Sequence, residues 1–359
     1  MPMRHRVLVC CAAGLCLAVL ATISPASAQK PVSPKPRSGE GGWVVPRMAD
    51  GHPDLQGTWE NNSATPLERP AAFANKPKLT DAELADMKAR AARLFAPDAD
   101  AAFGDGFYLA LLANANTAPF GTGSYAANWL PNRNLEHRTS LITDPPDGKL
   151  PPLTDTATRA RAAAAAARPR FPRGPEDMFV TDRCISYGIP DLFAAYMSLY
   201  RITQTPGYVA IAMEKIHDVR LIPLDGHAHI SSKIRHYVGD PRGHWDGNTL
   251  VVETTNFHPN GNAMGGLFRF ADENLKLTER FTRTAADAMS YEFTVDDPTV
   301  WTRPWTAMVP WTRATGSIYE YACHEGNYSI ANMLSAARAD ERQAEREAER
   351  AGAATSRDR

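Results

Sequence analysis

The chain lacks the short motifs that mark several large enzyme classes. It contains no glycine-rich phosphate loop, no dinucleotide-binding fingerprint and no Gly-x-Ser-x-Gly turn. These absences argue against nucleotide cofactors and α/β-hydrolase chemistry. His227 and His229 could place two rings on one side of a strand, but no third ligand follows at a fixed spacing and no His-Glu-x-x-His motif occurs. We therefore predict neither a cofactor nor a metal site.

Charge of either sign is not in excess. The sequence has 39 Lys and Arg residues against 40 Asp and Glu residues. A nucleic-acid-binding protein usually carries a basic face, so nothing here favours a nucleic-acid partner. Proline is abundant, at 28 residues, which argues against long continuous helices and for many turns. With 359 residues the chain can bury a large core in one or two domains.

Long hydrophobic runs are missing except at the N-terminus, where residues 1–28 resemble a secretory signal peptide. Two arginines precede an apolar run from Val7 to Ile23, and Ala26-Ser27-Ala28 forms a cleavage site. The alternative is a membrane anchor, although the run is a little short for one. We predict an exported protein, periplasmic or secreted, without a membrane span in the mature chain. A flexible linker is expected over residues 29–42.

Cysteine is scarce, and only Cys184 and Cys323 lie outside the predicted leader. An even number of cysteines in an exported protein indicates a bridge between them. The alternative is two separate buried thiols, because separation along the sequence does not fix separation in space. We predict a disulfide between these two residues.

The spacing of hydrophobic residues changes from helical to strand-like along the chain. Segment 43–175 mixes irregular stretches with helices predicted at Asp81–Phe95, Phe107–Leu112 and Asp155–Ala167, and a short strand at Thr139–Ile142. From Met197 onward, alternating stretches separated by turn residues predict antiparallel strands. These strands are expected at 199–204, 208–213, 217–223, 243–245, 249–255, 275–283, 289–295, 306–313 and 317–323.

A meander of short antiparallel strands closes most simply into a barrel, or packs as a two-layer sandwich. We predict a mainly β protein with a lipocalin-like barrel domain over residues 176–332. The mixed segment 43–175 should wrap around this barrel. Residues 333–359 are expected to form a charged helical tail, which has Arg–Glu pairs but no apolar stripe.

One predicted strand carries a carboxylate on its apolar face. Alternation over Leu275–Phe281 places Glu279 between Leu277 and Phe281 on the side that faces the core. Burying a charge is costly unless the charge is paired, so Glu279 needs a partner or a function. The structural interpretation pairs it with Arg220. The functional interpretation makes it a general base or an anchor for a ligand.

A second candidate cluster combines Glu214, His217 and Arg220. Glu214 and His217 flank a predicted turn, so both could lie at one mouth of the barrel. Histidine titrates near neutral pH and can act as an acid or a base. The alternative is that His217 is a solvated residue at the end of a hairpin.

Aromatic residues form a third candidate. Trp301, Trp305 and Trp311 occur close to two prolines, and such a group could form a rigid lip that stacks a sugar or an aromatic ligand. The alternative is a core plug that closes one end of the barrel. Tyr291 and Tyr321 complete the predicted ligand-binding residues.

Several segments resemble a large family of exported bacterial proteins of unknown function. The resemblance spans the region from about Trp43 to Asn332, and it implies export and a shared fold but no activity. The segments that carry it are Gly51–Trp59, Thr139–Gly148, Ile216–Arg220, Trp245–Thr254, Thr278–Phe281 and Cys323–Glu325.

Three functions remain open at this point. The first is an exported barrel that binds a small apolar or aromatic ligand. The second is a cofactor-free hydrolase, lyase or isomerase that uses Glu279 or His217 as its base and an arginine to stabilise negative charge. The third is an envelope structural protein without a small ligand. An open, lined cavity with Glu279 and Arg220 unpaired would favour the enzyme, and an apolar cavity would favour binding. A filled barrel would argue against both.

Overall fold

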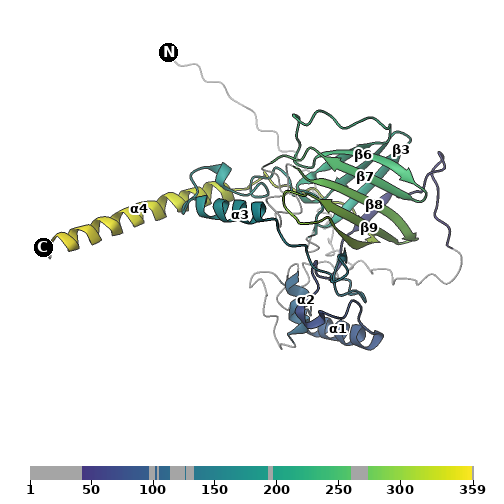
Figure 1. Cartoon of the computed structure of the whole chain (residues 1–359), viewed down its shortest axis with the longest axis horizontal. Helices are drawn as coiled ribbons and strands as arrows, with labels where there is room; N and C mark the ends of the chain where they lie inside the picture. The colour runs from purple at the N-terminus through teal and green to yellow at the C-terminus, as the bar shows by residue number, and fades with distance from the viewer. Residues whose placement is uncertain are drawn as a thin grey trace, which may run out of the picture. The chain divides into compact units, whose positions relative to one another are not determined.

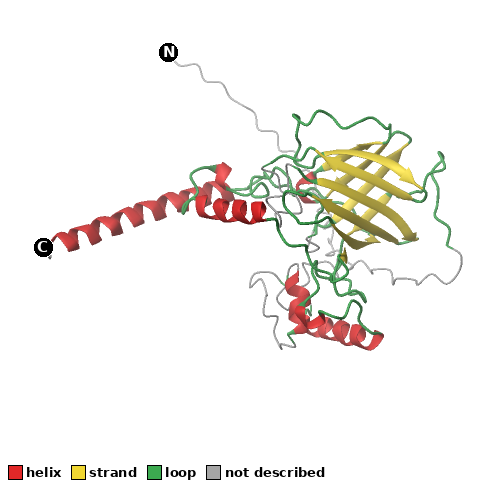
Figure 2. Ribbon diagram, viewed as in Figure 1, coloured by secondary structure: helices red, strands yellow, loops and turns green. Residues whose placement is uncertain are grey.

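The computed structural model describes residues 43–96, 102, 105–113, 126, 133–192, 197–259 and 274–357. The predicted signal peptide and linker lie outside this part of the chain. Within it, the fold is mainly β, with four α-helices and a single extended sheet (Figure 2).

Nine strands form an antiparallel sheet that curves into a nearly closed barrel (Figure 1). A short additional strand, β2 (Ile142–Asp144), pairs with β10. The predicted antiparallel barrel is therefore confirmed. In spatial order the nine strands are β5 (Val219–Pro223), β4 (Tyr208–Met213), β3 (Leu199–Thr205), β1 (Gly57–Glu60), β10 (Trp305–Arg313), β9 (Ala288–Asp296), β8 (Lys276–Ala285), β7 (Thr249–Thr255) and β6 (Asp240–Asp246).

Strand β1 joins two meanders into one barrel. Its Trp59 pairs with Tyr200 on β3 and with Arg313 on β10. This strand lies outside 176–332, the range predicted for the barrel, so the N-terminal segment contributes a strand to the barrel wall. Its four residues are too few for their alternation to mark a strand reliably.

The last predicted strand, 317–323, does not form. Strand β10 already pairs with β9 on one side and with β1 and β2 on the other, so no edge remains for a further strand. Residues 317–323 instead form an irregular connection to the C-terminal helix. The alternation in this stretch therefore gave a wrong prediction.

The barrel closes between β5 and β6 by the packing of side chains. A Cβ atom added at Gly243 on β6 would lie 2.7 Å from Ile222 Cγ2 and 2.8 Å from Leu224 Cδ2. A side chain at this position would require Ile222 and Leu224 to move. Glycine at position 243 therefore allows the close approach that seals this side of the barrel.

The helices match their predicted positions closely. Helix α1 (Asp81–Leu94) begins with a capping box, in which the Thr80 side chain accepts from the Glu83 N–H and Glu83 binds back to Thr80. Helix α2 (Asp105–Leu112) packs against α1 in a hydrophobic cluster separate from the barrel core. Helix α3 (Asp155–Ala167) has the predicted bounds. Helix α4 (Ser329–Arg357) begins four residues before the predicted tail.

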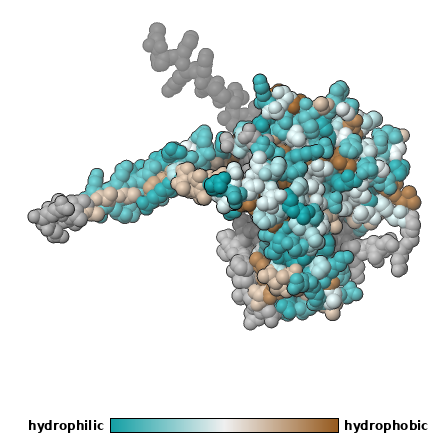
Figure 3. Space-filling model, in the orientation of Figure 1, coloured by the Kyte–Doolittle hydropathy of each residue, from teal (hydrophilic) through white to brown (hydrophobic). Residues whose placement is uncertain are grey.

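Hydrophilic residues cover most of the face seen in Figure 3, and hydrophobic ones are scattered among them. None of the helices in the described part of the chain is both long enough and apolar enough to cross a membrane.

Candidate functional site

A buried ion pair lies at the centre of the barrel. Arg220 on β5 donates from Nη1 to Oε1 of Glu279 on β8 at 2.9 Å, and its Nη2 binds Oε2 of the same carboxylate. The side chains are 3% and 0% exposed, so the pair has almost no contact with water. Alternation correctly predicted that Glu279 points inward, and the predicted structural partner, Arg220, is present. This bidentate geometry is the strongest form of an Arg–carboxylate contact.

Two hydroxyl groups complete this polar centre. Tyr291 on β9 donates to Glu279 Oε1 at 2.8 Å, and Arg220 Nη2 donates to Thr254 Oγ1 on β7 at 3.2 Å. Burial, together with the neighbouring Glu279 carboxylate, raises the pKa of Tyr291 well above its usual value. Burial would lower the pKa of Arg220, but the Glu279 carboxylate outweighs this effect and raises it. Both groups therefore keep their protons.

This arrangement stabilises the charges of Arg220 and Glu279 and does not favour proton transfer. Guanidinium and phenol donors use three of the roughly four lone-pair positions of the Glu279 carboxylate. A general base needs a free oxygen aimed at a substrate. Aromatic rings also fill the space beside the pair: Tyr291 stacks on Phe281 with ring centroids 4.9 Å apart and lies 4.8 Å from the ring of Trp311. The barrel interior around Glu279 is thus packed by its own side chains.

A second buried ion pair lies in the same core, and sequence reasoning did not identify it. Lys215 Nζ donates to Asp191 Oδ2 at 2.7 Å, and the Tyr200 hydroxyl donates to the same oxygen at 2.9 Å. Lys215 also lies over the Tyr187 ring, with its Nζ 4.6 Å from the ring centroid. Burial lowers the pKa of Lys215, and the Asp191 carboxylate offsets part of that effect. Asp191 lies in an irregular segment without periodicity, so no pattern marked it as buried.

The predicted cluster of Glu214, His217 and Arg220 is not brought together at one mouth. The chain between β4 and β5 turns through a left-handed backbone at Ile216 (φ 50°) and His217 (φ 46°). As a result, Glu214 is buried, His217 is exposed, and Arg220 points into the core. His217 therefore matches the alternative interpretation, a solvated residue at the end of a strand.

The predicted aromatic lip is part of the core. Trp301 and Trp305 are 2% and 0% exposed, and their rings meet edge to face with centroids 5.8 Å apart. Tyr291 is likewise buried within the barrel. Tyr321 is in the irregular connection after β10, because the strand predicted there does not form. The tryptophans thus match the plug interpretation and present no ring face to solvent.

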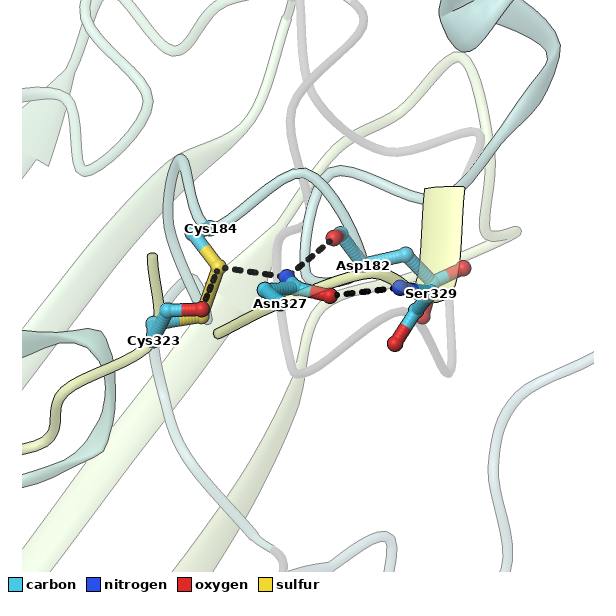
Figure 4. The surroundings of a disulfide bond; sticks show 5 residues. All are labelled: Asp182, Cys184, Cys323, Asn327 and Ser329. Atoms are coloured by element: carbon cyan, nitrogen blue, oxygen red, sulfur yellow. Dashed lines mark hydrogen bonds between the residues drawn. A yellow bond between two sulfur atoms is a disulfide. The ribbon is translucent and has the colours of Figure 1, made fainter. Parts of the chain in front are cut away.

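The predicted disulfide is present and ties two distant loops together. Cys184 and Cys323 are bonded across a sequence separation of 139 residues. Figure 4 shows Asn327 beside this bond: its Nδ2 donates to Cys184 Sγ at 3.3 Å and to the Asp182 carbonyl at 3.5 Å. Its Oδ1 accepts from the N–H of Ser329, the first residue of α4, at 3.0 Å. One asparagine therefore connects the disulfide to the start of the C-terminal helix.

Two carboxyl groups lie close to each other near the end of β1. Burial, with a further contribution from Glu214, raises the pKa of Glu60 above 4.5. Burial also raises the pKa of Glu214, although its Oε1 accepts from the Tyr319 N–H at 3.3 Å. The ammonium of Lys215, which binds Asp191, offsets only part of the effect of burial on Glu214. The negative charges of Glu60 and Glu214 are therefore only partly balanced when both carboxyl groups are ionised.

We expect Glu60→Gln to stabilise the protein at neutral pH, by about 1 kcal/mol or less. Because the folded pKa of Glu60 lies above 4.5, the folded protein binds this proton more tightly than the unfolded chain does. Stability is therefore lost as pH rises above about 4.5, and the amide removes that loss. Melting temperatures from pH 4 to 8 should fall less steeply in the variant. Glu320→Gln, at an exposed position, is the control, and equal slopes in wild type and Glu60→Gln would contradict the prediction.

A surface cavity of about 510 Å³ lies away from the barrel interior. The segment between α3 and the disulfide forms most of its wall, and Met333 on α4 completes it. The cavity is lined by Ala165, Arg168, Pro169, Arg170, Pro172, Asp177, Met178, Phe179, Asp182 and Met333. We call this cavity the α3–α4 groove. No sequence pattern marked it, because its residues come from an irregular segment and from the helices on either side of it.

The charged side chains that line the α3–α4 groove are two arginines, Arg168 and Arg170, and two carboxylates, Asp177 and Asp182. The Arg168 guanidinium lies 5.9 Å from the Phe179 ring centroid, and that of Arg170 lies 5.1 Å from the ring of Phe171. Neither arginine has a carboxylate partner within the described residues. By contrast, Asp177 accepts from the Arg173 N–H at 2.7 Å, and Asp182 accepts from the Phe179 N–H at 3.3 Å. The groove thus offers two arginines without a carboxylate partner, beside an apolar wall and two carboxylates that accept from nearby backbone N–H groups.

Comparison of the chain with protein-family models, with curated proteins and with solved structures finds no match. Within the described residues, no three His, Cys, Asp or Glu side chains are placed to hold a metal ion.

Proposed function

We propose that this protein is an exported barrel that binds a small aromatic anion, such as an aryl carboxylate, in the α3–α4 groove. The observation that carries the proposal is the pair of arginines, Arg168 and Arg170, that line a cavity of about 510 Å³ without a carboxylate partner in the described part of the chain. This volume is within the range of small-molecule sites. The barrel serves as the rigid support on which the groove is built.

The chemistry of the groove supports both parts of such a ligand. Planar guanidinium groups bind carboxylates through two parallel hydrogen bonds, and an aromatic ring beneath each guanidinium holds it in place. Phe179, which is 40% exposed, and the thioethers of Met178 and Met333 offer an apolar surface for a ring. The closed barrel interior around Glu279 supports neither an internal ligand nor catalysis by this residue.

Calorimetric titration with 2-naphthoate tests this proposal. The carboxylate should bind, and the uncharged isostere 2-naphthamide should bind at least about tenfold more weakly, because it cannot form charged hydrogen bonds with the arginines. The double variant Arg168→Gln/Arg170→Gln should lose affinity for 2-naphthoate to a similar extent. Arg159→Gln is the matched control, because Arg159 is an exposed arginine on α3 that does not line the groove.

Two outcomes would contradict the proposal. Equal affinity for the carboxylate and the amide would show that the arginines do not recognise charge. Failure to bind aryl carboxylates at all would instead favour the remaining alternative, an envelope protein whose filled barrel has a structural role.

A further inference from the structure

We propose a second binding site, for a phosphate-type oxyanion, formed by Arg283 and Arg313 around the ring of Trp59. This site shares no residue with the α3–α4 groove and does not depend on the function proposed for it. Arg283 lies near the end of β8 and Arg313 ends β10, with β9 between them in the sheet. The topology thus brings together two arginines that are distant in the sequence.

Both guanidinium groups contact the same indole. The Cζ atoms of Arg283 and Arg313 lie 5.7 Å and 5.6 Å from the Trp59 ring centroid, and Arg283 is also 5.8 Å from the ring of Trp43. Trp59 itself is fully buried, and its Nε1 donates to the Leu55 carbonyl at 2.9 Å. The ring that orients both arginines is therefore fixed in place.

Backbone carbonyl groups hold the arginines but leave donors unused. Arg283 donates to the carbonyls of Asp54 at 2.9 Å, Ala286 at 2.7 Å and Ala285 at 3.3 Å. Arg313 donates to one carbonyl, that of Gln56, at 3.4 Å. Because a guanidinium has five N–H groups, both side chains keep N–H donors that bind nothing within the described residues.

The backbone at Gly57 makes room for one of these groups. A Cβ atom at this position would lie 2.8 Å from Arg313 Nη2, and the φ angle of +125° is one that other residues rarely adopt. Glycine thus lets the guanidinium lie directly against the main chain of β1. The space that a side chain would fill is occupied by a cation.

The positive charges of Arg283 and Arg313 lie near the same tryptophan ring, and neither has an ion-pair partner among the described residues. Neither arginine forms a salt bridge with any of the described residues, and Asp54 is the acidic residue that acts on Arg283. Burial and the charge of Arg313 together lower the pKa of Arg283, and Asp54 offsets only part of this effect. Repulsion between neighbouring like charges favours the binding of a counter-anion. A phosphate group, which can carry two negative charges, matches two guanidinium groups better than a single carboxylate does.

Titration with inorganic phosphate against chloride at matched ionic strength tests this site. The Nε–H resonances of Arg283 and Arg313 should shift together and saturate. Arg313→Gln should weaken phosphate binding at least about tenfold. In chloride alone this variant should melt at the same temperature or higher, because it removes the repulsion between the arginines. A purely structural role for Arg313 would instead lower the melting temperature and leave phosphate binding unaffected.

Matched variants separate this site from other arginines. Arg201→Gln, at an exposed position on the neighbouring strand β3, should bind phosphate as the wild type does. Arg168→Gln/Arg170→Gln should leave the Arg283 resonance shift intact, whatever it does to aryl carboxylate binding. A response that does not saturate, or an equal loss in Arg201→Gln, would overturn the proposal.

Discussion

Glu279→Gln should lower the free energy of unfolding by about 3–5 kcal/mol, the usual cost of breaking a buried ion pair. The variant leaves the Arg220 guanidinium, which is 3% exposed, inside the barrel without a counter-charge. It also weakens the bond from the Tyr291 hydroxyl, which lies 2.8 Å from the carboxylate. Denaturant unfolding at pH 7 measures the change directly.

Replacement of both charged partners gives the sharper form of this experiment. Arg220→Met should be as destabilising as Glu279→Gln, because it leaves the carboxylate buried alone. The double variant Arg220→Met/Glu279→Leu should recover part of the loss, since it leaves no unpaired charge in the core, although the Tyr291 hydroxyl loses its acceptor. If Glu279→Gln melts at the wild-type temperature or above, the carboxylate is strained, and a functional role for Glu279 should be reconsidered.

Loss of the Cys184–Cys323 disulfide should be the other large effect. In the chain-entropy model, a bond across 139 residues stabilises the folded state by roughly 4–5 kcal/mol. The variant Cys184→Ala/Cys323→Ala should therefore unfold at a clearly lower denaturant concentration than the oxidised wild type. Cys184 is 5% exposed, so alanine at this position also creates a small cavity that adds to the loss.

Reduction provides the control for that variant. A dithiol should shift the wild type toward the stability of the double variant and should leave the double variant unchanged. Thiol titration of denatured, unreduced protein should detect no free thiol at positions 184 and 323. Two free thiols in that sample, or equal stabilities with and without the dithiol, would refute the prediction.

The parts of the structure that the sequence could predict are those with a strong local period. Glu279 was placed inside the barrel because side chains alternate along a long strand, and its position between Leu277 and Phe281 left one orientation. Helix α1 was predicted from a capping box and helical spacing. In both cases the residues that determine the structure are neighbours in the chain.

Features that depend on contacts between distant segments could not be predicted in this way. Asp191 lies in an irregular segment, and nothing near it in the sequence indicates that Lys215 lies 2.7 Å away. The stretch 317–323 alternates like a strand, but β10 has no free edge to pair with it. Likewise, the sequence does not indicate that Arg168 and Arg170 line one cavity, or that Arg283 and Arg313 lie near the same tryptophan ring. Local pattern carries no information on which edges and surfaces the fold leaves open.

The position of β1 has a consequence for how the protein folds. Gln56, beside this strand, and Arg313 are in contact although 257 residues separate them. The barrel wall therefore cannot be completed until β10 has been synthesised and has met β1, and closure between such distant segments is slow. Until then the edge of β1 that pairs with β10 is open to other chains. While the chain folds, this edge has to be protected from aggregation until β10 has paired with it.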